Sequence, residues 1–206
     1  MTEFVGEAAT TVILASASLS RAALLTAAGV PYRAEAASID EEEVKVTLRA
    51  EGAPAVAVAE TLAELKARRV AARYREALVI GADQVLECDG TLYDKPSDPA
   101  HAGAQLSELS GRTHCLHASV CVVRDARRLW HHSDMAEMEM RRLSERFIDR
   151  YLAAVGDDAC RSGGAYRLEG LGAQLFARVR GDYFTVLGLP LLPLLQFLRE
   201  HGVLLG

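Results

Sequence analysis

A carboxylate interrupts a strongly apolar stretch of this chain at residues 78–86. The run LVIGADQVL places Asp83 directly after Gly81 and Ala82, whose small side chains leave room for a ligand to approach the backbone. An acid in so apolar a strand costs free energy unless it is paired, bound to a metal or open to a cleft. Asp83 is therefore the first candidate for catalysis or metal binding; the alternative is an aspartate that caps or turns the chain at a strand end.

A lysine is expected close to this acid. The apolar strand ends at an Asp-Gly pair at 89–90, which is a strong signal for a tight hairpin. The return strand, residues 91–94, is followed by Lys95. Pairing in this hairpin would bring Lys95 back towards Asp83, so that the acid gains a cationic neighbour.

An anion-binding helix start is predicted near the N-terminus. A short strand over 11–14 leads through small and hydroxyl residues into a helix over 22–28. This order directs free backbone N–H groups and the positive end of the helix dipole at one point. Ser18 adds a hydroxyl there, and Arg21 adds a planar fork suited to phosphate. Plain N-capping by Ser18 or Ser20 is the alternative, and it is compatible with anion binding.

Two further helices carry charges that could face the same site. The four acids at 40–43 are typical of a solvated helix start, although one of them could instead help to hold a cation. A long helix is predicted over 54–75, with an apolar stripe that includes Leu62 and Leu65. Lys66 follows at the margin of this stripe, so its ammonium either lies over the end of the sheet or reaches water.

Helices and strands alternate along the whole chain, with hairpins that a purely parallel sheet would not contain. This pattern predicts one α/β domain with a mixed sheet. The remaining predicted elements are helices over 99–109, 144–154 and 190–200, strands over 113–124, 128–140 and 173–179, a glycine-rich loop over 162–172 where the backbone approaches another segment closely, and a turn at 181–182.

Length and charge restrict the class of protein. The 206 residues suffice for one substantial core and are few for two independent domains. A net charge of −5 offers no electrostatic footprint for a nucleic-acid polymer or an anionic membrane. The sequence contains neither a signal-peptide pattern nor an apolar run of membrane-spanning length, so we expect a cytoplasmic protein.

The cysteines are scattered without any C-x-x-C pair, which favours reduced thiols over a disulfide framework or a zinc site. His114, Cys115 and His117 lie close together in the sequence. We interpret them as residues of a strand, with His114 and Cys115 on opposite faces, rather than as metal ligands. The four cysteines are Cys88, Cys115, Cys121 and Cys160.

Five segments match the motifs of a known family in order and spacing, and on them the chain resembles the Maf family of nucleotide pyrophosphatases from residue 12 to residue 198. The resemblance implies an α/β fold like that of the inosine-triphosphate pyrophosphatases: an elongated mixed sheet flanked by helices, with a central cleft between two lobes. We expect residues 1–206 to form this single domain, with 1–11 as a flexible extension, and the resemblance also implies a homodimer. The matching segments are LASASLSR at 14–21, IGADQV at 80–85 with Lys95-Pro96, LSGRTH at 109–114, GAY at 164–166 with Glu169-Gly170, and GLP at 188–190.

The same resemblance implies hydrolysis of a nucleoside triphosphate between its α- and β-phosphates, with a divalent cation such as Mg²⁺ or Mn²⁺. Asp83 matches the family's catalytic acid, which is assigned as proton acceptor. Because a free aspartate is only weakly basic near neutral pH, we expect Asp83 to act as much by binding the metal, together with Glu41, as by taking a proton. The family's polar cleft positions match Ser18, Arg21, Glu41, Lys66 and Lys95.

Three positions are associated with the choice of nucleotide in this family, and here they are Ser20, Gln84 and Glu169. Gln84 and Glu169 match the branch resembling 7-methyl-GTP pyrophosphatases, and a carboxylate can accept both N1–H and N2–H₂ of guanine. Ser20 departs from the bulky aromatic of that branch, and Ala22 stands where many members have a second arginine.

Two alternatives remain open. A dTTP/UTP pyrophosphatase of the same family would be distinguished by a panel of triphosphates. A non-catalytic nucleotide sensor or regulator of cell division would bind nucleotide without releasing pyrophosphate, and the presence of Asp83, Lys66 and Lys95 argues against it. The motifs of P-loop NTPases, Rossmann dehydrogenases and serine hydrolases do not occur in the sequence.

Overall fold

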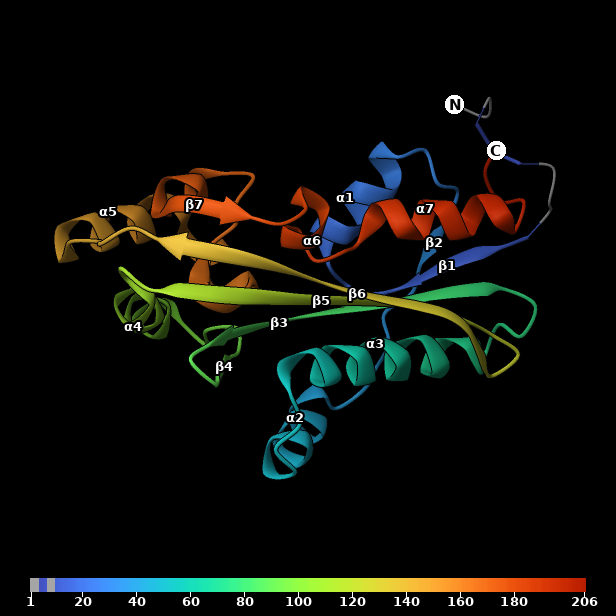
Figure 1. Cartoon of the computed structure of the whole chain (residues 1–206), viewed down its shortest axis with the longest axis horizontal. Coiled ribbons are helices and arrows are strands. Elements are labelled where there is room, and N and C mark those ends of the chain that lie inside the picture. Colours follow the sequence, from blue (N-terminus) through green and yellow to red (C-terminus); the bar gives the residue numbers. More distant parts are fainter. Residues whose placement is uncertain (1–3, 7–9) are drawn as a thin grey trace. The chain divides into compact units, whose positions relative to one another are not determined.

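The computed structural model describes residues 4–6 and 10–206. These residues form a seven-stranded sheet in the order β2-β1-β3-β5-β6-β7, with β4 paired to β3 off this path (Figure 1). Parallel pairs (β1 with β2 and β3) and antiparallel pairs (β3 with β4, β6 with β7) both occur, which confirms the predicted mixed sheet. The strands are β1 (Val12–Ala15), β2 (Arg33–Ala34), β3 (Leu78–Cys88), β4 (Thr91–Tyr93), β5 (Thr113–Arg124), β6 (Arg127–Met140) and β7 (Phe176–Arg180).

Helices flank the sheet, and most of them begin where the sequence predicts. Asp40, Asp98 and Ser144 cap α2, α4 and α5 with their side chains, because each accepts a backbone N–H three residues on. None of the helices in the described ranges is both long and apolar enough to cross a membrane. The helices are α1 (Leu19–Ala27), α2 (Glu41–Ala50), α3 (Ala55–Ala71), α4 (Pro99–Leu109), α5 (Glu145–Val155), α6 (Tyr183–Val186) and α7 (Leu191–Glu200), with 3₁₀ helices η1 (Gly156–Arg161), η2 (Gly163–Ala165) and η3 (Leu171–Leu175).

Contacts between residues divide the chain into two compact units. Unit 1 comprises Met1–Gln84, Ala118–Asp134 and Gly188–Gly206, and unit 2 comprises Val85–His117 and Met135–Leu187. The strands β3, β5 and β6 each continue from one unit into the other.

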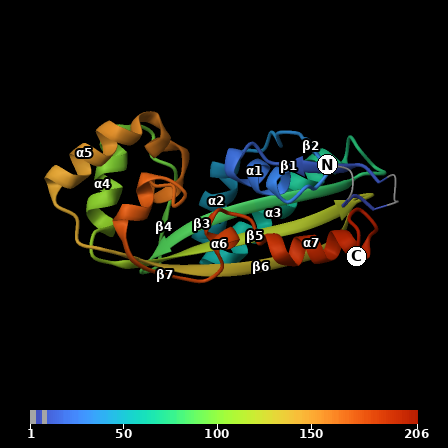
Figure 2. The ribbon, with the colours of Figure 1, turned by 90° about the horizontal axis from the view of Figure 1, so that it is seen from above.

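In unit 1, β1 is the buried parallel strand between β2 and β3. Its register with β3 runs from Val12 opposite Leu78 to Ala15 opposite Gly81. The helices α1 and α7 cover one face of this part of the sheet, and α3, with α2 on its outer side, covers the other (Figures 1 and 2). All four residues of β1 are buried, as a strand covered on both faces requires.

The glycine in β3 serves helix packing. A Cβ on Gly81 would lie 2.1 Å from the carbonyl oxygen of Ala63 and 2.8 Å from the Cβ of Ala67, both on α3. The room beside Gly81, which the sequence suggested was left for a ligand, is therefore filled by α3. The missing side chain lets the helix and strand approach closely.

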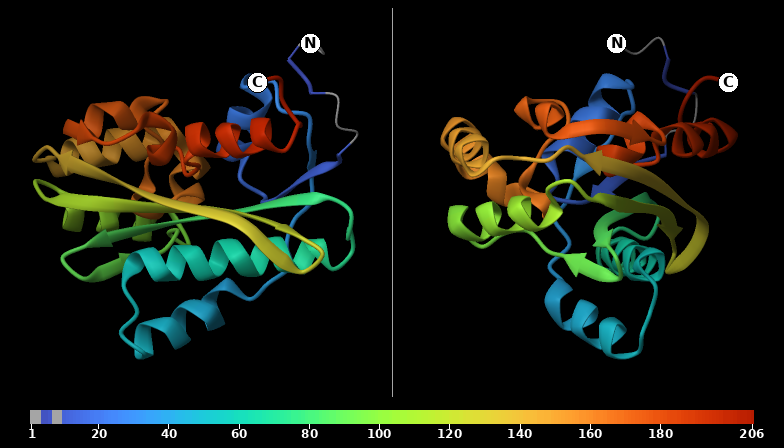
Figure 3. Two further views of the ribbon diagram at one scale, coloured as in Figure 1. Left: turned by 45° about the vertical axis from the view of Figure 1, so that its right-hand side comes forward. Right: turned by 60° about the vertical axis from the view of Figure 1, so that its left-hand side comes forward.

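In unit 2, α4 and α5 lie side by side and pack with the 3₁₀ helices (Figures 2 and 3). The glycine-rich loop makes the close approach that was predicted, since a Cβ on Gly163 would lie 2.9 Å from the carbonyl oxygen of Tyr93 in β4. The β3–β4 hairpin is confirmed, with Leu86 opposite Tyr93. Its turn uses positive φ angles at Asp89 (49°) and Gly90 (80°), as tight hairpins require.

Several elements differ from the sequence prediction: α1 begins at Leu19 rather than at residue 22, and α3 ends at Ala71 rather than at residue 75. The strand expected over 173–179 begins only at Phe176, because pairing with β6 starts there opposite Met140. The preceding residues, without a ladder partner, form η3 (Leu171–Leu175) instead. The turn at 181–182 continues into the short helix α6, which Asp182 caps by accepting the backbone N–H of Thr185 at 3.0 Å.

The expected N-terminal extension, residues 1–11, lies partly outside the described residues. Within the described part, the backbone N–H of Gly6 donates to the carbonyl of Val203 at 2.9 Å, and that of Leu205 donates to Phe4 at 3.0 Å. Phe4–Gly6 is therefore tied to the C-terminal segment. The flexibility expected for the extension as a whole stays a prediction.

His114 is a core residue of unit 2 and not part of a charged site. It is 1% exposed, and its Nε2 lies 2.7 Å from the hydroxyl of Tyr166. The ring packs against Tyr166 and Phe176, with centroids 5.7 and 5.9 Å away. Burial lowers the pKa of His114 from 6.5 to about 4. The histidine is therefore neutral in the folded protein at physiological pH.

This histidine should make stability depend on pH. The pKa of His114 is lower in the folded state than its ordinary value of 6.5. The contribution of His114 to the free energy of unfolding is therefore fully present above pH 6.5 and is lost as the pH falls towards 4. Between pH 8 and pH 5, the wild type should lose about 2 kcal/mol more unfolding free energy than His114→Gln, measured by urea denaturation. The control His131→Gln removes an exposed histidine and should follow the wild type. Equal pH slopes for His114→Gln and the wild type would contradict the assignment.

Candidate active site

Serine hydroxyls shape the connection from β1 to α1. The Oγ of Ser18 accepts the backbone N–H of Arg21 at 3.4 Å, which makes Ser18 the N-cap. The Oγ of Ser16 accepts the backbone N–H of Ser18 at 3.2 Å and Nη1 of Arg21 at 3.1 Å. The helix start predicted to attract anions therefore stands beside the Arg21 guanidinium.

Arg21 is buried, with 8% of the residue exposed. Its Nε donates to the carbonyl of Gly188 at 2.7 Å. Burial lowers the pKa of Arg21, while the carboxylates of Asp83 and Glu41 raise it. Because a guanidinium stays charged in proteins, Arg21 brings a permanent positive charge near these two acids.

The Asp83 carboxylate is buried against a lysine. Nζ of Lys66 donates to Oδ1 of Asp83 at 2.6 Å and lies 2.9 Å from Oε1 of Glu41. Asp83 is 5% exposed and Lys66 is 6% exposed. The prediction that Lys66 lies at the margin of the apolar stripe is therefore wrong: Lys66 lies inside the stripe, and Leu65 is the exposed neighbour. The sequence allowed the Lys66 ammonium either to lie over the end of the sheet or to reach water. In the structure it lies over the sheet, against Asp83.

The geometry of β3 and α3 brings this pair together. Asp83 follows Gly81 by two residues, so their side chains share one face of the strand. That face packs directly on Ala63 of α3, and Lys66 comes one helical turn later. β1 ends at Ala15, opposite Gly81, so Asp83 lies past the end of the neighbouring strand.

We call Arg21, Glu41, Lys66 and Asp83 the charged cluster. Glu41 is the first residue of α2 and keeps 42% of its side chain exposed, whereas the side chains of Lys66 and Asp83 are 8% and 7% exposed. Two cations and two carboxylates give the cluster a formal charge of zero. The cluster is therefore balanced before any ligand arrives, and it has no surplus positive charge for a polyanion.

Gln84 lies on the opposite face of β3 from Asp83, because successive strand residues alternate. A Cβ on Gly188 would lie 3.6 Å from Oε1 of Gln84 and 3.4 Å from Nε of Arg21. Gly188 has a φ of 91°, which an L side chain rarely adopts. It thereby presents its carbonyl to Arg21 beside Gln84. The sequence analysis did not assign this role to Gly188. The Gly-Leu-Pro motif at 188–190 could have pointed to it.

The predicted site residues fall in both units. Lys95 is exposed and follows β4 in unit 2. Its approach to Asp83 therefore stays a prediction, although the hairpin that motivated it is present. The unit 1 residues are Ser18, Ser20, Arg21, Glu41, Lys66, Asp83 and Gln84, of which Ser20 lies in the first turn of α1; Lys95 and Glu169 belong to unit 2.

Glu169 is held by an arginine two residues away. Nε and Nη2 of Arg167 donate to Oε1 of Glu169 at 3.1 and 2.8 Å, and this pairing raises the pKa of Arg167. Both residues border a cavity of about 310 Å³ within unit 2. The other residues that line it include Tyr151, Val155, Asp158 and Leu171.

Comparison with known proteins identifies the family. Residues 11–201 match the family described as Maf-like protein, so the chain belongs to the Maf family. The family resemblance and the mixed α/β fold predicted from the sequence are both confirmed.

Three relatives illustrate the similarity. The nucleoside triphosphate pyrophosphatase of Paramagnetospirillum magneticum is 53% identical over 93% of this chain and 99% of the relative. The 7-methyl-GTP pyrophosphatase of Rhizobium meliloti is 50% identical over 93% of this chain and 96% of the relative. The 7-methyl-GTP pyrophosphatase of Rhizobium johnstonii is 48% identical over 94% and 98%, respectively. These relatives match this chain over nearly their whole length.

Proposed function

We propose that this protein hydrolyses 7-methyl-GTP between its α- and β-phosphates, releasing the monophosphate and pyrophosphate. Its broader class is that of its family and relatives: it is a nucleoside triphosphate pyrophosphatase, an enzyme of the hydrolase class. The observation that carries the proposal is the charged cluster beside the start of α1, where Asp83 is held by Lys66. A homodimer and a cytoplasmic location stay predictions.

A divalent cation fits the two carboxylates of the charged cluster. Asp83 and Glu41 already direct oxygens at one positive group, the Lys66 ammonium, at 2.6 and 2.9 Å. Carboxylate oxygens are ligands that Mg²⁺ and Mn²⁺ favour, so these two residues would hold the ion. Bound there, the ion would supply the positive charge that the balanced cluster lacks for a triphosphate.

In this proposal, residues of unit 1 have separate roles in hydrolysis of the triphosphate. Asp83 orients the attacking water and accepts its proton, while Lys66 keeps the carboxylate in place. Arg21, held by Ser16 and the Gly188 carbonyl, offers a fixed positive charge to the developing charge on the phosphate oxygens. Little covalent chemistry is required of the protein, because phosphoryl transfer depends mainly on positioning and charge stabilisation.

The choice of 7-methyl-GTP is supported by Glu169. Its pairing with Arg167 fixes the carboxylate at the edge of the unit 2 cavity, whose volume of about 310 Å³ is at the lower end of small-molecule sites. A guanine offers N1–H and N2–H₂ side by side to such an acceptor, and thymine offers no such pair. N7-methylation adds a positive charge to the base, which a carboxylate favours. Gln84 and the names of the two Rhizobium relatives point in the same direction.

A dTTP/UTP pyrophosphatase is the second candidate. Ser20, in the first turn of α1, provides no aromatic face on which a guanine could stack. A member of the family with this residue could therefore accept a pyrimidine nucleotide instead. A purely regulatory, non-catalytic protein is disfavoured, because the charged cluster is complete.

A triphosphate panel with the Asp83→Asn variant tests the proposed function. With Mg²⁺ or Mn²⁺, the wild type should release pyrophosphate faster from 7-methyl-GTP than from GTP, UTP or dTTP. Asp83→Asn should lower kcat by about 100-fold or more, because the amide neither accepts a proton nor binds a cation as a carboxylate does. Asp149→Asn, an exposed position on α5, is the matched control and should keep wild-type activity. An Asp83→Asn enzyme with most of its activity would refute the assigned role, and a preference for UTP or dTTP would favour the second candidate.

Glu169→Gln tests the choice of base separately. The amide oxygen can still accept from Arg167, so the loop should keep its shape while the negative charge is lost. We expect kcat/KM for 7-methyl-GTP to fall relative to that for UTP by about tenfold or more, measured as pyrophosphate release. Glu145→Gln at the start of α5 is the matched control. If the ratio of the two substrates is unchanged, Glu169 has no part in specificity.

A further inference from the structure

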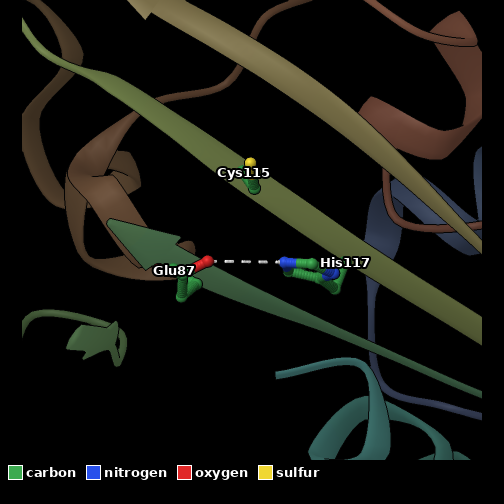
Figure 4. Close-up of side chains that lie close together, drawn as sticks. All are labelled: Glu87, Cys115 and His117. Atoms are coloured by element: carbon green, nitrogen blue, oxygen red, sulfur yellow. Dashed lines mark ion pairs between the residues drawn. The ribbon is translucent and has the colours of Figure 1, made fainter. Parts of the chain in front are cut away.

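A second group of potential metal ligands lies in unit 2 and involves none of the residues discussed above for catalysis. Glu87 on β3 and Cys115 and His117 on β5 place one ligand atom each within 4.8 Å of one another (Figure 4). The sequence favoured Cys115 and His117 as strand residues rather than metal ligands; both do lie on β5, but because they are two residues apart they share a face, on which Glu87 joins them. Nε2 of His117 lies 3.7 Å from Oε2 of Glu87, the contact drawn as a dashed line in Figure 4.

The ring of His117 lies at ion-pair distance from Glu87, 3.7 Å, which is too long for a hydrogen bond. Its Nε2 is buried and, among the described residues, has no hydrogen-bond partner. A buried polar atom left unpaired costs free energy, and such atoms in folded proteins call for an explanation. A metal ion between His117, Glu87 and Cys115 would satisfy this nitrogen.

The Glu87 carboxylate is already oriented for this role. Its Oε1 accepts the backbone N–H of Gly90 in the β3–β4 turn. This hydrogen bond holds one oxygen in the turn and leaves Oε2 facing His117. Partners that orient a ligating carboxylate in this way are a regular feature of metal sites.

We propose that Glu87, Cys115 and His117 form a zinc-binding site that joins β3 to β5 in unit 2. One sulfur, one nitrogen and one oxygen ligand suit Zn²⁺, whereas Mg²⁺ and Mn²⁺ prefer oxygen alone. In a tetrahedral zinc site, nitrogen and oxygen ligands lie about 3.4 Å apart, close to the distance found here before any ion is bound.

Charge and access agree with zinc. On binding, the Cys115 thiol loses its proton to solvent, and the thiolate and the Glu87 carboxylate together neutralise the two positive charges of the ion. All three residues are only half-buried, so an ion can enter and a water can take the fourth position. The site would stabilise unit 2 by fixing two neighbouring strands to each other.

Metal titration of the full chain tests the proposal with a readout other than activity. After dialysis against EDTA, Co²⁺ is added as a spectroscopic probe, and its thiolate-to-cobalt absorption reports binding by a cysteine. We expect about one Co²⁺ per chain with this band, and displacement of the band by Zn²⁺. The band excludes the oxygen-only site of Asp83 and Glu41, so the two metal proposals are tested independently.

Variants assign the ligands. Cys115→Ser should abolish the cobalt band, and His117→Gln should weaken Zn²⁺ binding by at least about tenfold. Cys160→Ser alters a half-buried cysteine outside the group and should leave both unchanged. Zn²⁺ should also raise the Tm of the wild type more than that of His117→Gln. No thiolate band in the wild type, or a band and a Tm shift that persist in both Cys115→Ser and His117→Gln, would overturn the proposal.

Discussion

The buried ion pair between Lys66 and Asp83 is the interaction on which the charged cluster of unit 1 depends. Nζ of Lys66 and Oδ1 of Asp83 lie 2.6 Å apart with almost no exposure to water, and burying either group without a partner would cost free energy. Removing one partner of such a pair typically costs about 3–5 kcal/mol, a large part of the stability of a domain. The tight packing of α3 on Gly81 places the two side chains together, so packing and charge are coupled at this point.

The same pair bears on the proposal that a metal ion takes part in the chemistry. Lys66 contacts both Asp83 and Glu41, and Arg21 interacts electrostatically with both carboxylates. With two cations and two carboxylates, the charged cluster has a formal charge of zero. A polyanionic substrate gains little from a neutral site. A divalent cation on the two carboxylates would change that balance. Under the proposed function, stability of the resting enzyme and affinity for triphosphate would rest on the same carboxylates.

The sequence indicated much of this arrangement, but not all of it. Asp83, Arg21 and the capping role of Ser18 could be found because an acid in an apolar strand and serines before a helix have a local physical meaning. Asp98 and Ser144 marked their helices for the same reason. Burial of Lys66 could not be predicted, since it depends on how α3 is rotated against β3. The buried face of α3 lies one residue away from the predicted apolar stripe, so Lys66 is buried and Leu65 is exposed. The η3 segment and the Glu87 group also depend on strand pairing between residues far apart in the chain, which local patterns do not reveal.

The most direct test of this account is the metal dependence of substrate binding. A non-hydrolysable analogue of 7-methyl-GTP, with a methylene group between the α- and β-phosphorus atoms, can be titrated by calorimetry into the wild-type protein with Mg²⁺ or with EDTA. If the charged cluster is balanced as described, binding should be tight with Mg²⁺ and much weaker with EDTA. Equal affinity under both conditions would show that the protein alone offsets the triphosphate, and would contradict the account.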